Sequence, residues 1–409
     1  MVNQTLQFII GLVVNGEPYK TSTRIKVYIY DMSIDRTSCD RNKFINRIPY
    51  ETLISRDQAR EKDLRSDYYR DSTAIMHSMP FRRLKHKTQV FFAPSNDHIC
   101  TRMEHSMHVA SIAGSIASSL GLDSELVWAI GLGHDTGHTP FGHVGERVLQ
   151  KFWDETKKDG DPEFQHELLS LRTLRHTALG TKGLNLTYAV LDGVVSHCGE
   201  SFGKSKMKPD FCVKDFDSIK NRSCIVPSTW EGVVVRFSDS IAYLGRDAED
   251  AARMGLIKME DIPQPVQKYL GSTNGEIINS LVNNLVENSS EEEGIGFSKD
   301  INEIVHNFAE FNYKYIYKSE YMNRETAKRE RLLTLLFDYI KYLYSTYTKC
   351  PESLLNEKVA MADNFKSYLD KRIPVYKTRG EGEKELLFDY ISGLTDTFAI
   401  DSAIAILGE

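Results

Sequence analysis

An apolar helix that runs into a histidine-rich bend constrains this chain more than any other feature. Residues 125–135 read ELVWAIGLGHD and are apolar on nearly every side, so a helix here has to be buried. The chain continues through GHDTGHTPFGHVGE (133–146), where three histidines and two carboxylates stand among glycines and a proline. These glycines and the proline argue against one regular helix or strand. They predict a bend that turns the titratable groups towards one cavity.

The composition indicates a soluble globular protein. The 409 residues are 41% hydrophobic and 26% charged, close to average values. The formal net charge of −6 gives no reason to expect general binding to nucleic acids or anionic membranes, although a local basic site stays open. Six scattered cysteines without a C-x-x-C pair argue against a disulfide framework or zinc ribbon and favour reduced thiols in a cytoplasmic protein.

Membrane segments are not expected. No apolar run reaches the roughly 18 residues that suggest a membrane span. The segment LQFIIGLVV (6–14) comes closest, but it lacks the basic start and small-residue cleavage site of a signal peptide.

Helical patterns dominate after a β-rich start. The runs 6–14 and 24–31 flank Asn15-Gly16 and predict a small hairpin. Apolar residues then recur at helical spacing, and long helices are predicted over 105–122, 231–257, 329–347 and 383–407. The segments 198–211 and 288–296 are predicted to be surface loops. We expect a mainly α-helical domain over 51–409, preceded by an N-terminal extension over 1–50 with the possible hairpin.

The residues themselves suggest a metal site. His134 and Asp135 stand at the end of the buried helix, and His105 opens another helix. Asp239 lies within the apolar helix 233–244, where a carboxylate is costly unless it is paired or binds a metal. Two imidazoles and two carboxylates suit Mn²⁺, Fe²⁺, Co²⁺ or Zn²⁺ better than Mg²⁺. A single His-Asp pair is more often packed or solvated than functional, so these residues alone leave both interpretations open.

Several ordered blocks carry a resemblance to a known family. They are FRRLKHKTQVF, TRMEHSMHV, GHDTGHTPFGHVGE, FQHELLSLRTL, VVRFSDSIAYLGRDAEDA and FDYISGLTDTFAI, which fall between about Arg56 and Ala403. Together they resemble the HD-domain deoxynucleoside triphosphate triphosphohydrolases, which include bacterial dGTPases and the mammalian SAM-and-HD-domain enzyme. The resemblance implies the helical HD-domain phosphohydrolase fold. It also implies metal-dependent hydrolysis of dNTPs, with dGTP favoured, to a deoxynucleoside and inorganic triphosphate.

The resemblance assigns roles residue by residue. One divalent ion per active site, with Mn²⁺ favoured and Mg²⁺, Fe²⁺, Co²⁺ or Zn²⁺ as alternatives, is expected on His105, His134, Asp135 and Asp239. The pair that activates the attacking water falls on His143 and Glu146. The histidines on the phosphate side fall on His138 and His166.

The same resemblance assigns substrate contacts. Arg102 matches an arginine at the α-phosphate. Gln89 and Val90 match a pair that contacts the sugar and crowds its 2′ position. Tyr243 and Asp247 match groups around the 3′-hydroxyl, and their spacing from Asp239 places all three on one helix face. Core packing is the alternative for Tyr243.

Other interpretations stay open. The basic residues Arg82, Arg83, Lys85 and Lys87 indicate either a solvated helix face or charge that neutralises phosphates. One alternative activity is that of another HD-domain nucleotidase or phosphodiesterase. An alternative of another class is a catalytically silent protein that senses nucleotides or binds single-stranded DNA.

The family also suggests partners, and the chain departs from it in places. Family members form tetramers or hexamers, some take dNTP effectors, and some bind single-stranded DNA, so a homo-oligomer is expected and the other two partners stay open. The stretch 197–211 fits no family block. Ser240 stands where the mammalian enzyme has a phosphate-contacting lysine, and His77 and Lys85 replace its guanine-reading residues. A GTP-type activator is therefore not expected.

Overall fold

A computed structural model describes residues 44–61, 63–92, 96–180, 182–198, 205–223 and 225–408, together with the backbone of 13–14 and 17–18. The chain divides into two units, Met1–Cys39 and Asp40–Glu409. In the first unit, β1 (Val13–Val14) pairs antiparallel with β2 (Glu17–Pro18). Its two strands stand on either side of Asn15-Gly16 in the sequence, with Glu17–Pro18 as the second strand. The segment 24–31, predicted as the second strand, lies outside the described residues.

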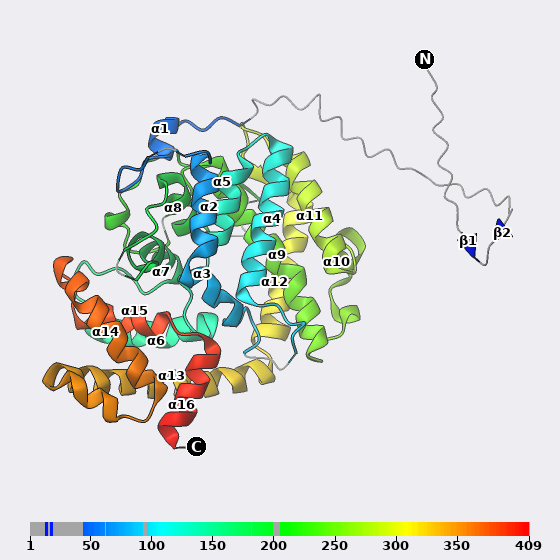
Figure 1. The fold of residues 1–409 in the computed structure, drawn as a ribbon. Coiled ribbons are helices and arrows are strands. Elements are labelled where there is room, and N and C mark those ends of the chain that lie inside the picture. The colour runs from blue at the N-terminus through cyan, green and yellow to red at the C-terminus, as the bar shows by residue number, and fades with distance from the viewer. Residues whose placement is uncertain are drawn as a thin grey trace, which may run out of the picture. The chain divides into compact units, whose positions relative to one another are not determined.

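Buried helices form the centre of the second unit. The helix α5 packs beside α4, α2 and α8, and α9 packs against α4 (Figure 1). Their bounds are α2 (Asp67–His77), α4 (Arg102–Leu120), α5 (Ser124–Gly133), α8 (Tyr188–Val195) and α9 (Trp230–Arg253). Most of α5 is fully buried, as its apolar sequence predicts. It begins at Asp123, whose carboxylate accepts hydrogen bonds from the amides of Glu125 and Leu126, and this satisfies two otherwise unpaired donors.

Further elements surround this centre. Their bounds are α1 (Tyr50–Leu53), α3 (Met79–Arg83), α6 (Gly142–Thr156), α7 (His166–Arg172), α10 (Gln264–Tyr269), α11 (Asn274–Asn288) and α12 (Lys299–Asn312). The strand β3 (Lys206–Met207) pairs antiparallel with β4 (Ile295–Gly296). The described parts of the two predicted loops therefore meet in a short ladder, which their sequences did not indicate.

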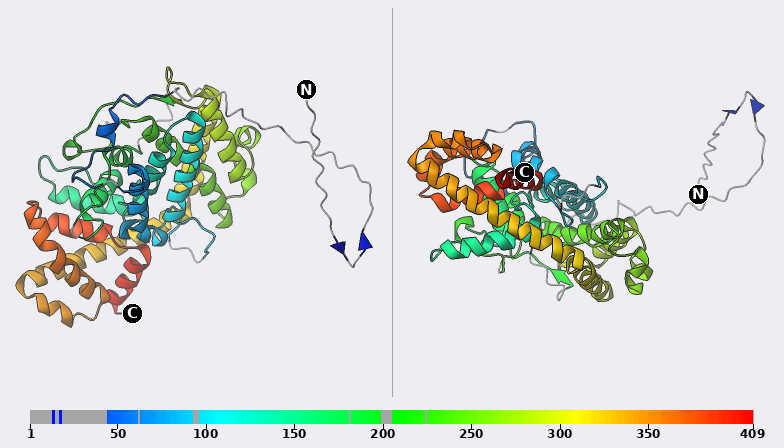
Figure 2. Two further views of the ribbon diagram at one scale, coloured as in Figure 1. Left: turned by 45° about the horizontal axis from the view of Figure 1, so that its top comes forward. Right: turned by 90° about the horizontal axis from the view of Figure 1, so that it is seen from below.

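The last helices gather on one side of this unit. They are α13 (Glu320–Lys349), α14 (Ala360–Thr378), α15 (Glu383–Ser392) and α16 (Asp396–Leu407). The long helix α13 contacts α6, α14, α15 and α16 and runs as a straight rod in the view from below (Figure 2). The fold is therefore mainly α-helical with a small β element, as predicted.

Membrane-spanning potential is limited to one helix pair. Among the described residues, no single helix is both long and apolar enough to cross a membrane. The pair α15 and α16, bent by 109°, meets that criterion together by length and composition.

Candidate functional site

Three helices bring the four predicted metal residues together. His105 lies in the first turn of α4, His134 and Asp135 follow α5, and Asp239 lies in the middle of α9. His105 Nε2 is 2.8 Å from Asp239 Oδ1. His134 Nε2 is 3.4 Å from Asp135 Oδ2 and 3.9 Å from Asp239 Oδ1. All four residues are buried, so the arrangement concentrates two imidazoles and two carboxylates in a small volume.

The ring of His134 suits a metal ligand. Its Nδ1 lies 2.7 Å from the carbonyl oxygen of Gly131. Because a carbonyl only accepts, Nδ1 carries the hydrogen and Nε2 is left with its lone pair. Within the described part of the chain, this buried Nε2 has no hydrogen-bond partner. Metal-binding histidines commonly donate their other N–H to a backbone carbonyl in this way. The donor set and this orphaned nitrogen therefore fit a divalent cation.

Charge within the cluster favours a cation. Burial alone would lower the pKa of His134, but the carboxylates of Asp135 and Asp239 raise it. Burial also opposes ionisation of Asp135, yet His134, Arg102 and His138 hold the pKa of this carboxyl well below its usual range. The hydrogen bond from His105, acting against burial, lowers the pKa of Asp239 to about 2. Both carboxylates are thus ionised at neutral pH, and the site attracts positive charge, whether a proton or a metal ion.

Backbone geometry explains why the bend needs its glycines. Phe141 and Gly142 both have a positive φ, 61° and 55°, so the chain turns sharply before α6. A Cβ on Gly137 would lie 2.1 Å from the backbone nitrogen of Ser170, and only glycine permits this approach of the bend to α7. The turn brings His138 Nε2 to 3.3 Å from Asp135 Oδ1.

Next to the metal residues, the four predicted catalytic side chains form one network. His143 Nδ1 is 3.0 Å from Glu146 Oε2. The amide of His166 donates to Glu146 Oε1 at 2.9 Å, and His166 Nδ1 lies 3.2 Å from both carboxylate oxygens. The rings of His138 and His166 stack with their centroids 4.0 Å apart. Only His143 of these four is exposed, with 62% of its side chain accessible.

The buried members of this network hold different charges. Burial opposes protonation of His166, but Glu167 and Glu146 raise its pKa to about 9. Burial, Arg102 and His166 together lower the pKa of His138 well below its usual range. Despite burial, His166 and His143 keep the pKa of Glu146 far below its usual range. At neutral pH the network therefore combines a carboxylate, a cationic His166 and a neutral His138.

Arg102 links the predicted metal residues to residues 88–90, which include the predicted sugar contacts Gln89 and Val90. We call residues 88–90 the predicted sugar segment. Its guanidinium pairs with Asp135 through Nη1 and donates to the carbonyls of Thr88 and Gln89 at 3.1 and 3.3 Å. The side-chain oxygen of Gln89 is buried without a partner among the described residues. Val90 is half-buried against the core.

The remaining predicted substrate residues lie further along α9. Tyr243 is half-buried one turn after Asp239, and Asp247, one turn later, accepts a hydrogen bond from the hydroxyl of Tyr317 at 2.5 Å. Burial raises the pKa of Asp247 to about 7.

Sequence reasoning missed His197. This residue follows α8 and is 1% exposed. Its Nδ1 lies 2.6 Å from the carbonyl of Val194, and its Nε2 lies 3.9 Å from Asp135 Oδ1. His134, Asp135 and His197 thus form one metal-sized group and His105, His134 and Asp239 form another, so the two groups share His134. The available signal was a histidine two residues after a mostly apolar helix, a position similar to that of His134 after α5, but it fell where no family block was recognised.

The basic residues of the segment 82–87 lie in different environments. Arg82 and Lys85 are exposed, as expected for a solvated face. Lys87 is buried, and its ammonium donates to the carbonyls of His138 and Ser392. Burial lowers the pKa of Lys87 well below its usual range. Its ammonium is therefore already engaged in joining the bend to the end of α15.

Comparison with known proteins places this geometry in a family. The HD domain family matches residues 102–222, and the phosphohydrolase-associated domain family matches residues 295–403. A deoxyguanosinetriphosphate triphosphohydrolase-like protein of Caldanaerobacter subterraneus is 36% identical over 361 residues, which cover 88% of this chain and 91% of that protein. A protein of the same description from Desulfatibacillum aliphaticivorans is 33% identical, covering 82% of this chain and 86% of that protein. This chain belongs to the deoxyguanosinetriphosphate triphosphohydrolase-like family.

Membership of the triphosphohydrolase-like family makes the chain an HD-domain hydrolase, and most of the candidate site lies within the range of the HD domain match. His105, His134, Asp135 and the His143–Glu146–His166 network all fall within 102–222, while Asp239 lies beyond it on α9. A crystal structure of a hypothetical protein from Aquifex aeolicus is similar over 67% of this chain and 61% of that chain, with 21% identity and a TM-score of 0.37.

Proposed function

We propose that this chain hydrolyses deoxynucleoside triphosphates to a deoxynucleoside and inorganic triphosphate. The observation that carries the proposal is the pairing of a metal-sized cluster with a separate proton-transfer network. His105, His134 and Asp239 form one metal-sized group, Asp135 belongs to a second such group with His134 and His197, and His138 of the proton-transfer network has its Nε2 3.3 Å from Asp135 Oδ1. The relatives named above are deoxyguanosinetriphosphate triphosphohydrolase-like proteins, so dGTP is the first substrate to test.

The reaction assigns a task to each side chain. Water attacks the α-phosphorus, the bond from this phosphorus to the sugar 5′ oxygen breaks, and that oxygen takes up a proton. With its Nδ1–H donated to Glu146, His143 presents the lone pair of Nε2, which accepts the proton of the attacking water. The cationic His166 and the guanidinium of Arg102 stabilise the negative charge that develops on the phosphate. A divalent ion, with Mn²⁺ favoured, would polarise the α-phosphate and the water when bound.

The metal assignment has its own test. Asp135→Asn keeps the shape of the side chain but removes its charge, so bound Mn²⁺ and hydrolysis are both expected to be lost. Metal content is measured by elemental analysis after dialysis against Mn²⁺. Asp154→Asn, an exposed carboxylate in α6, is the matched control. A variant at Asp135 that retains full metal content contradicts the assignment.

Selection for deoxyribose is expected at Val90. In the proposed pose Gln89, Tyr243 and Asp247 hold the 3′ side of the sugar, and Val90 packs against its 2′ carbon. A 2′-hydroxyl without a hydrogen-bond partner costs about 1–3 kcal/mol, so kcat/KM for dGTP should exceed that for GTP at least about tenfold. Val90→Ala should narrow this ratio. Equal kcat/KM values for the two nucleotides in the unmodified enzyme would contradict selection against the 2′-hydroxyl at Val90 and favour a general HD nucleotidase.

Product analysis separates the proposed activity from its rivals. Incubation with dGTP and Mn²⁺ should yield deoxyguanosine and intact triphosphate in equal amounts. Nucleoside monophosphate among the products indicates another HD-domain nucleotidase or phosphodiesterase. No turnover with any of the four dNTPs, singly or in pairs, indicates a protein that senses nucleotides or binds single-stranded DNA.

The proposal also includes an oligomeric state. We expect a homo-oligomer, a tetramer or hexamer, with dNTP effectors and single-stranded DNA as further partners to test. Light scattering with and without dNTPs measures the assembly, and monomers under both conditions would contradict it.

A further inference from the structure

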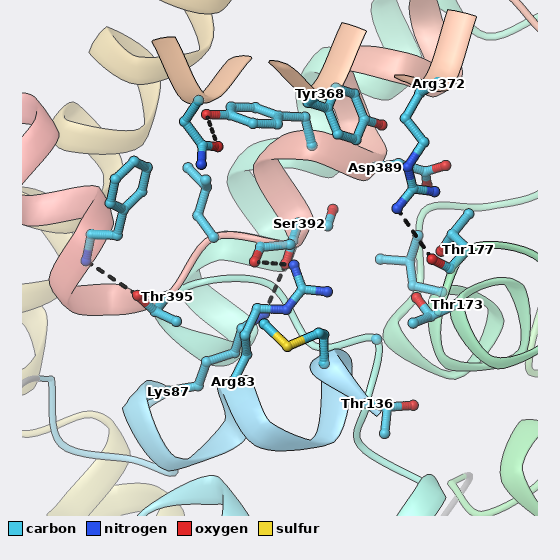
Figure 3. Close-up of a pocket in the computed structure, with 18 residues that line it drawn as sticks. Arg83, Lys87, Thr136, Thr173, Thr177, Tyr368, Arg372, Asp389, Ser392 and Thr395 are labelled. Carbon is cyan, nitrogen blue, oxygen red and sulfur yellow. Dashed lines mark hydrogen bonds between the residues drawn. The ribbon is translucent and has the colours of Figure 1, made fainter. Parts of the chain in front are cut away.

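A cavity of about 400 Å³ lies behind the bend, between the HD domain region and the last helices (Figure 3). Its polar lining includes Arg83, Thr136, Thr173, Thr177, Arg372 and Asp389. We call it the rear pocket. Thr136 and Gly137, which directly follow Asp135, form part of its wall, but no residue of the metal cluster or the proton-transfer network lines it. The rear pocket is therefore distinct from the candidate active site.

Among the described residues, the hydrogen bonds of the two rear-pocket arginines go to backbone carbonyls, and the guanidinium of Arg372 also lies over the ring of Tyr368, 5.4 Å from its centroid. Arg83 donates from Nη1 to the carbonyl of Gly393 at 2.7 Å, and Arg372 donates from Nη2 to the carbonyl of Thr177 at 3.2 Å. In the described part of the chain, neither guanidinium lies within ion-pair distance of a carboxylate. Burial and the neighbouring Arg372 lower the pKa of Arg83 to about 10, so the group remains cationic at neutral pH.

The carboxylate in the lining is already engaged. Asp389 accepts hydrogen bonds from Arg172, with the closest at 2.8 Å, and from the hydroxyl of Tyr376. Arg172 also pairs with Glu381 at 2.7 Å. Both oxygens of Asp389 are therefore engaged, by Arg172 and Tyr376, and among the described residues Arg83 and Arg372 have no carboxylate within ion-pair distance. A partly buried cation in this state is costly unless an anion joins it.

We propose that the rear pocket binds a phosphate-bearing small molecule, with Arg83 and Arg372 as its charged ligands. A phosphate dianion balances both guanidinium charges, and its several oxygens can accept from both arginines and from the hydroxyls of Thr173 and Thr177. Leu169, Tyr368 and Phe398 supply an apolar wall for the rest of the molecule. The volume lies in the range of small-molecule sites.

The site depends on a glycine. A Cβ on residue 393 would lie 2.7 Å from Nη1 of Arg83, so Gly393 lets the guanidinium reach the carbonyl that holds it at the cavity. This fixed donor is an arrangement that arginine provides for phosphate recognition. The proposal concerns binding alone and does not depend on the substrate proposed above.

Calorimetric titration with inorganic phosphate and with adenosine monophosphate tests the site. Both probes are titrated into the metal-free protein and into three single variants, Arg83→Gln, Arg372→Gln and Arg82→Gln. The last removes a positive charge from an exposed neighbour on α3 and is the matched control. We expect Arg83→Gln and Arg372→Gln each to weaken binding at least about tenfold, a change of about 1.4 kcal/mol. Arg82→Gln should stay within about twofold.

The outcomes distinguish an inorganic from an organic phosphate, and they distinguish binding in the rear pocket from binding in the candidate active site. Equal affinity for both probes assigns the site to the inorganic anion, and tighter binding of adenosine monophosphate assigns it to an organic phosphate. Because Arg83 also holds Gly393, circular dichroism checks that its variant folds, and Arg372→Gln carries the test if it does not. The proposal is overturned if neither probe binds, or if binding survives Arg372→Gln but is lost in Arg102→Ala, which would place the probe in the active site.

Discussion

His143 can be separated experimentally from the metal residues because most of its side chain lies in solvent. His143→Ala should leave the buried cluster and its bound Mn²⁺ intact while kcat falls by about 10²–10⁴, the usual contribution of an acid–base group. Steady-state kinetics and metal content, measured on the same preparation, check this result.

A second exposed histidine provides the control. His306 lies 3.4 Å from Glu310 on α12, far from the metal residues in the sequence, and His306→Ala should retain full turnover. Near-normal kcat in His143→Ala would assign His143 a structural role and make His138 or His166 the next proton acceptor to test.

Asp247 should make stability depend on pH. Its pKa is about 7 in the folded chain and about 3.9 in an unfolded chain. Between about pH 3.9 and pH 7 the carboxyl of Asp247 is therefore protonated in the folded state and ionised in the unfolded state. This difference lowers the free energy of unfolding as the pH rises, until the loss is complete above about pH 7. The Asp247→Asn variant has no ionisable group at this position. Its melting temperature relative to the unmodified protein should rise from pH 5 to pH 8 by about 2 °C or more.

The measurement for Asp247 is a pair of thermal unfolding series followed by circular dichroism. Asp401→Asn, on the exposed face of α16, is the control and should show no change between the two pH values. A difference for Asp247→Asn that is constant from pH 5 to pH 8 would mean that this carboxyl is already ionised at pH 5 in the fold.

Among the elements, α16 supports the candidate active site although it lies far from it in the sequence. Asp396, in its first turn, accepts from the amides of Thr88 and Phe141 at 2.9 Å each and from the Thr88 hydroxyl. It thereby joins the predicted sugar segment to the bend. Asp396→Ala leaves these buried donors unsatisfied, so the free energy of unfolding should fall by about 1–3 kcal/mol.

The same substitution should also lower kcat, because the bend and residues 88–90 lose a shared anchor. Chemical denaturation and kinetics check both effects, and Asp401→Ala in the same helix should change neither. Full activity in Asp396→Ala would show that the bend keeps its geometry without α16.

The elements that the sequence predicts well are those whose pattern has a local cause. The apolar run of α5 requires burial, and Asp123 caps it, so both were predictable. The spacing of Asp239, Tyr243 and Asp247 fixes a shared helix face. In contrast, the pairing of β3 with β4 joins residues 206–207 to 295–296, and a two-residue ladder leaves no periodic pattern. The role of Lys87 was also hidden, because its partners are backbone carbonyls of distant segments.

At the scale of the whole molecule, side chains tie the HD domain region to the helices at the C-terminal end. Arg172 of α7 pairs with Glu381 and Asp389, and Trp153 of α6 packs edge-on against Phe388 of α15 with ring centroids 5.0 Å apart. We therefore expect one cooperative unfolding transition of the second unit. Tryptophan fluorescence and far-ultraviolet circular dichroism should give the same midpoint.

The sequence does not predict these contacts between the HD domain region and the last helices, because residues about 200 positions apart leave no local pattern when they meet. Two separate midpoints in denaturant, with the fluorescence change confined to one of them, would show that the last helices unfold on their own. Arg172→Met, which removes the pairing with both carboxylates, is the variant most apt to separate them.

The hydrogen bonds that orient His134 and His197 have an evolutionary consequence. Each ring is held by a backbone carbonyl three residues earlier, at Gly131 and Val194, and every amino acid supplies that carbonyl. Mutation at residue 194 can therefore change the side chain without deleting the acceptor. The orientation of the His197 ring therefore does not depend on which side chain residue 194 carries, so a deep mutational scan should find His197 intolerant and the buried residue 194 comparatively permissive towards other apolar side chains. Residue 131 differs, because a Cβ there would lie 2.7 Å from the Cα atom of Ala110, and the scan should accept little besides glycine at that position.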